Sequence, residues 1–290
     1  MSEQVCKADM GGDGAAVVDT CGYPVETTGN AVLDILEHRS STRAFARDDD
    51  DRPVAVTDEQ RAAILHAASR APSAGAMMMY SIVSIREQAT LDRLADLCDH
   101  QPMIAKAPWA LIFVVDYAKW IDLFEHVGCF GPEFVERTGK SPRRAPGLGD
   151  FAIAAQDAVI AAQNAVVAAE ALGLGSCYIG DVVENAEEVA ALLDLPPYTM
   201  PLSMLIIGTP RKERPAIAHP VVNLVHEERY RRADGATMDA QVAEMDAMFR
   251  PHAREVGERV VDIYTRKHTS PFMAEMSRSM EWWFKNWLGK

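Results

Sequence analysis

Cysteine is scarce in this 290-residue chain, and no two cysteines stand at metal-ligand spacing. The five residues are far apart in the sequence, at Cys6, Cys21, Cys98, Cys129 and Cys177. An odd, scattered set without a Cys-x-x-Cys pair argues against a disulfide framework and is typical of reduced thiols. The histidines offer no pair at zinc spacing either. We therefore expect a cytoplasmic protein with no metal site.

Positive charge is also in short supply. The chain has 29 Lys and Arg against 42 Asp and Glu, a formal charge of −13. Such an excess of acid argues against nucleic acid or an anionic membrane surface as the main partner. The N-terminus lacks a basic region followed by an apolar run, so we expect no signal peptide. No internal repeat and no Ser-His-Asp or paired-carboxylate constellation stands out.

Hydrophobic residues, by contrast, make up 48% of the chain, enough for a sizeable core. Residues 1–29 are rich in Gly, Asp and Thr and are predicted to form a tail or a docking arm. Regular apolar periodicity begins at residue 30 and marks a main domain over 30–235. Residues 236–290 read as a C-terminal helical extension, predicted to pack at a dimer interface.

The chain is organised around residues 149–181. Residues 151–172 are rich in alanine and apolar on nearly every face, which predicts a buried core or dimer-interface helix. The length also suits a membrane span, but the polar residues would be costly in lipid. These are Gln156, Asp157, Gln163, Asn164 and Glu170. Residues 175–180 follow as a short turn and strand with a glycine at each end, where the backbone can approach a large, flat ligand.

Two basic clusters stand out against the acidic composition. Arg39 and Arg43 flank hydroxyl residues, and guanidinium forks with hydroxyl donors suit a phosphate monoester. Lys212 and Arg214 follow the apolar strand predicted over 202–208. From spacing alone, a solvated basic turn is the favoured interpretation of each cluster.

The remaining segments alternate helices, strands and loops. Thr57 begins a capping box for a helix over 57–70, and strands are predicted over 77–85 and 109–115. Residues 116–148 mix aromatic and basic residues and indicate an inserted helix and loop, either a lid over a site or a surface excursion. Near the C-terminus, three aromatic residues share one helical face: Trp283, Phe284 and Trp287.

Taken in order, these pieces resemble the FMN-dependent nitroreductase superfamily over most of residues 31–230. The family's Arg-x-Ser-x-Arg-x-Phe motif, which grips the FMN phosphate, stands here over residues 39–45, and a later Lys-x-Arg completes the phosphate site. The Pro-Ser-small-small segment at 72–76 resembles the one that lines the flavin from the partner subunit. Relatives have Asn where this chain has Ala76, so one amide contact to the flavin is absent or replaced.

The resemblance also assigns the ring contacts. Gln101 stands where the family reaches the pyrimidine edge of the flavin, and residues 178–180 stand where it passes beside the isoalloxazine. The preceding Cys177 is expected to be a structural thiol. In full, the resemblance implies FMN contacts from Arg39, Ser40, Ser41, Arg43, Pro72, Ser73, Ala74, Gly75, Ala76, Gln101, Tyr178, Ile179, Gly180, Lys212 and Arg214.

The implied fold is an α+β sandwich with a central mixed, largely antiparallel sheet flanked by helices, built as an interlocked homodimer. The implied activity is that of an FMN-dependent oxidoreductase. It takes a hydride from NADH or NADPH and passes it to a nitroaromatic, quinone or flavin acceptor in a ping-pong cycle. Two alternatives stay open: another reductive chemistry of the superfamily, such as ene reduction or dehalogenation, and a non-catalytic flavin-binding or storage protein.

Overall fold

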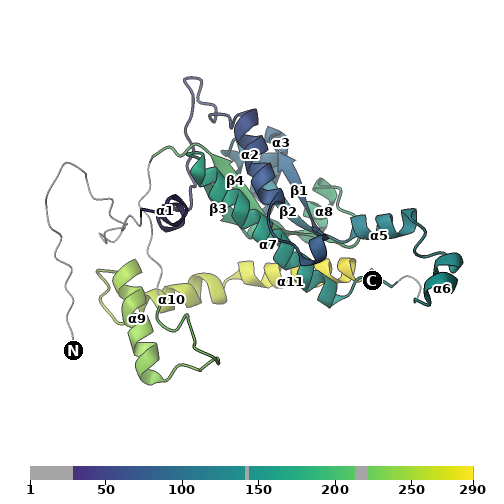
Figure 1. Ribbon diagram of the computed structural model, residues 1–290. Helices are drawn as coiled ribbons and strands as arrows, with labels where there is room; N and C mark the ends of the chain where they lie inside the picture. The colour runs from purple at the N-terminus through teal and green to yellow at the C-terminus, as the bar shows by residue number, and fades with distance from the viewer. Residues whose placement is uncertain (1–28, 141–143, 213–220, 290) are drawn as a thin grey trace.

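A four-stranded antiparallel sheet lies at the centre of the molecule (Figure 1). The computed structural model describes residues 29–140, 144–212 and 221–289. The strand order is β1-β2-β4-β3. The strands are β1 (Tyr80–Ile85), β2 (Trp109–Asp116), β3 (Gly175–Ile179) and β4 (Thr199–Gly208). An isolated parallel bridge between Ser41 and Ser176 makes the pairing mixed. The expected α+β class with a largely antiparallel sheet is confirmed.

Strand β2 runs through the middle of the core and is buried along its whole length. Its residues alternate between the two faces of the sheet because successive side chains of a strand point to opposite sides. Ala110, Ile112 and Val114 belong to one hydrophobic cluster, whereas Leu111 and Phe113 belong to another. This explains why the sequence shows a continuous apolar run rather than alternation.

Helices α2 (Asp58–Ser69) and α7 (Leu148–Ala171) lie against one face of the sheet (Figure 1). The capping box predicted at Thr57 is present, with the Thr57 hydroxyl accepting from the Gln60 N–H. The face that α7 turns inward carries Val166, Asp157 and alanines: Ala154, Ala158, Ala161, Ala162, Ala165 and Ala169. Such small side chains allow the helix backbone to lie close to the strands.

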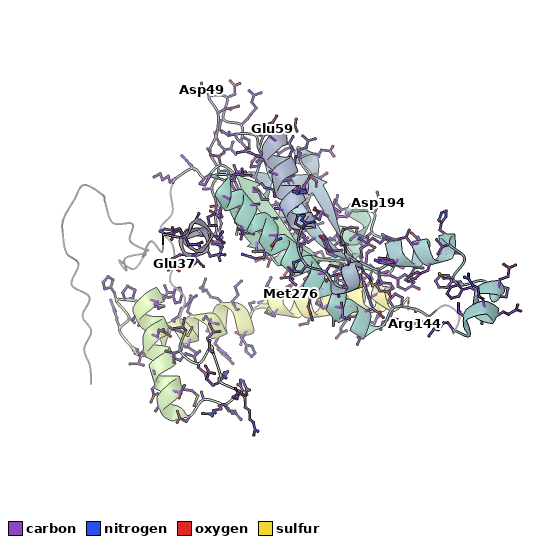
Figure 2. The ribbon with its side chains drawn as sticks, viewed as in Figure 1. Glu37, Asp49, Glu59, Arg144, Asp194 and Met276 are labelled. Atoms are coloured by element: carbon purple, nitrogen blue, oxygen red, sulfur yellow. The ribbon has the colours of Figure 1, made fainter. Side chains whose placement is uncertain are left out.

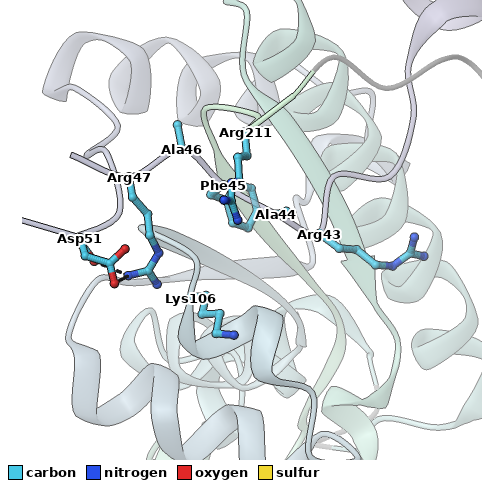
Figure 3. A pocket seen from close by; sticks show the side chains of 8 residues that line it. All are labelled: Arg43, Ala44, Phe45, Ala46, Arg47, Asp51, Lys106 and Arg211. Atoms are coloured by element: carbon cyan, nitrogen blue, oxygen red, sulfur yellow. Dashed lines mark hydrogen bonds and ion pairs between the residues drawn. The ribbon is translucent and has the colours of Figure 1, made fainter. Parts of the chain in front are cut away.

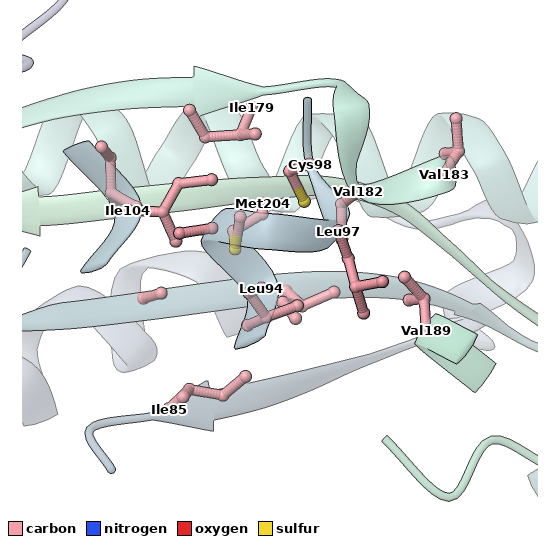
Figure 4. Packing of buried hydrophobic residues seen from close by; sticks show 14 of the residues in the cluster. Ile85, Leu94, Leu97, Cys98, Ile104, Ile179, Val182, Val183, Val189 and Met204 are labelled. Atoms are coloured by element: carbon pink, nitrogen blue, oxygen red, sulfur yellow. The ribbon is translucent and has the colours of Figure 1, made fainter. Parts of the chain in front are cut away.

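The other face of the sheet is covered by short helices and by the last helix of the chain. These are α3 (Gln88–Leu97), α4 (Pro102–Ala105), η2 (Asp181–Val183), α8 (Ala186–Leu192) and α11 (Pro271–Trp287). Figure 4 shows side chains from these segments, Leu94 and Ile104 among them, packed with Met204 of β4. Met276, labelled in Figure 2, brings α11 against the same cluster. Trp283 is fully buried there, as the aromatic face predicted for this helix requires.

Four helices extend away from the sheet (Figure 1). Within the predicted 116–148 insertion lie α5 (Ala118–His126) and α6 (Pro132–Thr138). In the C-terminal extension, α9 (Gly235–Phe249) packs on α10 (Glu258–Ile263), which a π-helical turn over Tyr264–His268 joins to α11. At the other end of the described chain, Asn30 caps α1 (Ala31–His38) by accepting from two backbone N–H groups.

Helix α7 is buried on one face only in the single chain. Its outer face leaves Ile153 44%, Val159 48% and Ile160 38% exposed. The inner face is therefore the core face that the sequence predicts, and the exposed outer face is the one left for the predicted dimer interface. Within the described residues, α7 is also the one helix long and apolar enough to cross a membrane. It lies instead on the sheet, with an acidic residue on its buried side.

A glycine substitution tests how closely the 41–45 segment lies on the sheet. A Cβ at Gly175 would lie 2.7 Å from the Cβ of Thr42, too close for any real contact. We predict that Gly175→Ala lowers the free energy of unfolding by about 2–3 kcal/mol in denaturant titration. The control is Gly149→Ala at an open position of α7, which should stabilise the protein by up to ~1 kcal/mol. Equal stability of both variants would contradict this packing.

A pH series tests the burial of Glu184, which is 4% exposed. Burial, with Asp181, Asp99 and Glu275 nearby, raises the pKa of Glu184 from 4.5 to about 7. The unfolded chain ionises first, so folded stability falls as pH rises from about 5 to 7. We predict that Glu184→Gln leaves stability unchanged at pH 5 and raises it by about 1–2 kcal/mol at pH 8.

The matched control for that series is Glu187→Gln. The carboxylate of Glu187 accepts two hydrogen bonds from Arg278, which lower its pKa. This substitution should slightly destabilise the protein at pH 8, the opposite sign to Glu184→Gln. If the free energy of unfolding of Glu184→Gln changes with pH in the same way as that of the wild type, the pKa of Glu184 is not raised in the folded protein.

Candidate functional site

The segment after α1 is held between the edge strand β3 and the turn that follows β4. The Thr42 N–H donates to the Ser176 carbonyl (2.8 Å), and the Ala46 N–H donates to the Thr209 carbonyl (2.8 Å). The Arg211 N–H donates back to the Ala44 carbonyl (3.0 Å). Backbone hydrogen bonds thereby join this segment to residues that lie 134 to 167 positions later in the chain.

This docking brings together most of the residues predicted to hold the FMN phosphate. Ser40, Ser41 and Arg43 lie on the docked segment, and Lys212 follows Arg211 directly. Arg39 precedes the segment, and its buried Nε has no hydrogen-bond partner among the described residues. An orphaned guanidinium nitrogen is a suitable donor for a phosphate oxygen. Arg214, the last predicted phosphate contact, lies outside the described residues.

The positive charge of Arg39 also affects the pKa values of two neighbouring side chains, Glu170 and Tyr178. Burial raises the pKa of Glu170, on the last turn of α7, to about 7, and the positive charge of Arg39 opposes this rise. Burial likewise raises the pKa of Tyr178 to about 12, again opposed by Arg39. The Tyr178 hydroxyl donates to Gln163 Oε1 at 3.3 Å. The C-terminal half of α7 therefore forms one wall beside the basic cluster.

The predicted ring-binding residues lie at the end of β3. Ile179 is 1% exposed and packs in the core, whereas Tyr178 and Gly180 on either side of it are exposed. Gln101, predicted to reach the flavin edge, lies beside this strand end, and its Nε2 donates to Asp181 Oδ2 at 2.6 Å. Cys177 is 3% exposed and packs in the same cluster, consistent with a structural thiol.

In the single chain, the predicted 72–76 segment lies away from the basic cluster. Pro72, Ala74, Gly75 and Ala76 are exposed, and the segment contains the 3-10 turn η1 (Ala74–Ala76). Its Ser73 and Ala74 hydrogen-bond to Asp157 of α7, thirteen residues before Glu170. At 1.5 Å per helical residue, the two sites are about 20 Å apart along α7. One chain therefore does not bring this segment to the basic cluster.

A basic pocket that sequence reasoning missed lies along the same docked segment. It has a volume of about 660 Å³ and is lined by Arg43, Ala44, Phe45, Ala46, Arg47, Asp51, Lys106 and Arg211. Figure 3 shows the Arg43 side chain extending away from Lys106 and Arg47. Arg47 is paired with Asp51 at 3.3 Å. The sequence signal was weak, because these cations come from three separate segments.

The residues present fit FMN better than a metal. Guanidinium groups and hydroxyls lie at the start of β3, and the exposed Tyr178 and Gly180 lie at its other end. In the part of the chain that the structure describes, no group of three His, Cys, Asp or Glu side chains is placed to hold a metal ion.

Comparison with known proteins gives the same family from sequence and from structure. The model of the Nitroreductase family matches residues 36–209. An FMN reductase [NAD(P)H] of Bacillus subtilis (strain 168) is 32% identical over 215 residues, 73% of this chain and 79% of its own. An oxygen-insensitive NADPH nitroreductase of Salmonella typhimurium is 32% identical over 218 residues, 73% of this chain and 81% of its own.

A solved structure shares the fold. The NADPH:FMN oxidoreductase of Vibrio harveyi, complexed with NAD+, superposes with a TM-score of 0.65 at 25% identity. That match covers 86% of this chain and 97% of the other. The order of motifs, the sheet with its docked basic segment, and these matches agree, and the chain belongs to the nitroreductase family.

Proposed function

We propose that the protein is an FMN-dependent NAD(P)H oxidoreductase that reduces nitroaromatic, quinone or flavin acceptors by ping-pong hydride transfer. The observation that carries this proposal is the docked 41–47 segment. It sets the arginine and hydroxyl residues of the phosphate motif beside the start of β3, where Ser41 pairs with Ser176. The matched relatives named as FMN reductase and NADPH nitroreductase support the same reaction class.

The chain's own residues position the cofactor rather than perform the redox step. Arg39, Arg43 and Lys212 supply positive charge to the phosphate, and the hydroxyls of Ser40 and Ser41 supply neutral donors. When bound, FMN supplies the hydride chemistry, accepting from NADH or NADPH and donating to the acceptor. No general acid or base from the chain is needed for that exchange.

The ring end of the site depends on backbone and amide groups. Among residues 178–180, Tyr178 and Gly180 are exposed and available to a ligand, and the buried Ile179 between them fixes this stretch to the core. Gln101 is held in place by its hydrogen bond to Asp181. N–H dipoles at this position favour the negative charge that a reduced flavin carries at its pyrimidine edge.

The site is completed by a second copy of the chain. The outer face of α7 exposes Ile153, Val159 and Ile160, and the neighbouring α1 exposes Val32 and Leu33. Exposed apolar side chains of this kind are typical of a homodimer interface. A two-fold pairing that sets the 72–76 segment of each subunit against the basic cluster of the other would complete both sites of such a dimer. The projecting α9–α10 pair is an arm suited to the same interlocked dimer (Figure 1).

The test is anaerobic mixing of the FMN-loaded protein with NADH and with NADPH. We predict that at least one of them bleaches the flavin absorbance and that a quinone or nitroaromatic then restores it. The two half-reactions should occur separately, as a ping-pong cycle requires. Flavin that stays oxidised with both nucleotides would contradict the reductase proposal and favour a flavin-storage protein, for which the loss of the family Asn at Ala76 is the supporting feature.

A control variant shows whether the flavin that is bleached is the one bound at the proposed site. The Arg39→Ala/Arg43→Ala double variant lacks two phosphate contacts, so it should be purified with far less FMN. With the same total FMN added, it should show bleaching much slower than the wild type. Equal bleaching would mean that the reaction does not use the proposed site.

A further inference from the structure

Asp157 is a buried acidic residue whose carboxylate accepts hydrogen bonds from the loop between α2 and β1. Its side chain is on the inner face of α7, and the residue is 2% exposed. Oδ1 accepts from the Ala74 N–H at 3.0 Å. Oδ2 accepts from the Ser73 hydroxyl at 3.0 Å and from the Met79 N–H at 3.3 Å. One carboxylate therefore holds both ends of the 73–79 loop.

Further hydrogen bonds close the loop around this anchor. The Met78 N–H donates to Ser73 Oγ at 2.6 Å, while the hydroxyl hydrogen of Ser73 is donated to Asp157. From the other side, the indole N–H of Trp120 donates to the Met77 carbonyl at 2.9 Å. The loop is thus fixed to α7 and to α5 although most of its residues are exposed.

The loop backbone needs such support. Gly75, Ala76 and Met78 have φ values of 58°, 55° and 48°, in the left-handed region. Residues with a Cβ disfavour this conformation, and it persists only where the surrounding structure imposes it. Two of these three residues carry a Cβ, so the local sequence alone does not select the observed shape.

We propose that Asp157 is a positioning residue for the flavin site. It fixes the 73–79 loop in the one shape that can pack against the flavin ring of the partner subunit. The neighbouring α7 residues Gln156 and Ile160 are exposed on the face that meets the second copy. Asp157 therefore ties the loop to the interface helix itself. This proposal rests on the proposed function, because the loop's ligand is the FMN of that site.

The chemistry of the side chain explains why an acid stands here. Three donors converge on Asp157, and an ionised carboxylate offers only acceptors. An asparagine of the same shape has one oxygen and one NH2 group. Whichever way it is turned, its NH2 group faces a backbone N–H, of Ala74 or of Met79. A neutral substitution therefore loses at least one end of the loop while preserving the volume of the buried site.

The experiment compares Asp157→Asn with Asn164→Ala on the same helix. Asn164 Nδ2 donates to the Ala67 carbonyl of α2 and does not touch the loop. We expect Asp157→Asn to weaken FMN binding by about tenfold in a fluorescence titration of apo-protein and to change the visible circular dichroism of the bound flavin. Asn164→Ala should lower the melting temperature but leave both flavin readouts unchanged. Wild-type affinity and dichroism in Asp157→Asn, or equal effects of both variants, would overturn the proposal.

Amide hydrogen exchange on the wild-type protein tests the same claim without flavin or substitution. After correction for intrinsic rates, the Ala74 and Met79 amides should exchange at about one tenth of the rate of the exposed Gly75 amide, or more slowly still. Equal rates would overturn the anchoring role even if Asp157→Asn does not fold. A wild-type protein that binds no FMN but protects these two amides would refute the proposed function and leave the anchoring intact.

Discussion

The close packing of α7 on the sheet is the contact on which the rest of the structure depends. The inner face of this helix carries almost only alanine, and small side chains let its backbone lie near the strands. The same helix holds α2 through Asn164, the 73–79 loop through Asp157 and Tyr178 through Gln163. A bulkier inner face would separate these elements from the sheet and from one another.

The helix also separates the two halves of the proposed flavin site. Arg39, which we propose binds the phosphate, lies beside its C-terminal end, and the loop proposed to face the flavin ring is anchored near its middle, about 20 Å away. A single chain therefore presents two incomplete surfaces on a helix whose outer face carries exposed apolar residues. A two-fold pairing that sets one surface of each chain against the other surface of its partner would complete two sites at once. The proposed dimer thus follows from where α7 places its neighbours.

Local features of the fold could be predicted from the sequence because they depend on nearby residues. The Asn30 cap, the Thr57 capping box and the apolar run of β2 each arise within a few positions. The phosphate motif could be predicted only through its resemblance to a family. The role of Asp157 could not, because its partners lie 78 to 84 residues away in the sequence. For the same reason the pocket containing Lys106 and Arg211 could not be predicted.

If each flavin site is built from two chains, mixed dimers of two different defective variants should recover part of the FMN binding. One variant carries Arg39→Ala and Arg43→Ala; the other carries Ala74→Trp, at a position that is exposed in the single chain. Each alone should bind little FMN. After joint unfolding and refolding at equal amounts, about a quarter of the sites should be intact, because half of the dimers are mixed and each has one undamaged site. FMN binding that does not recover on mixing, or wild-type binding by Ala74→Trp alone, would contradict the account.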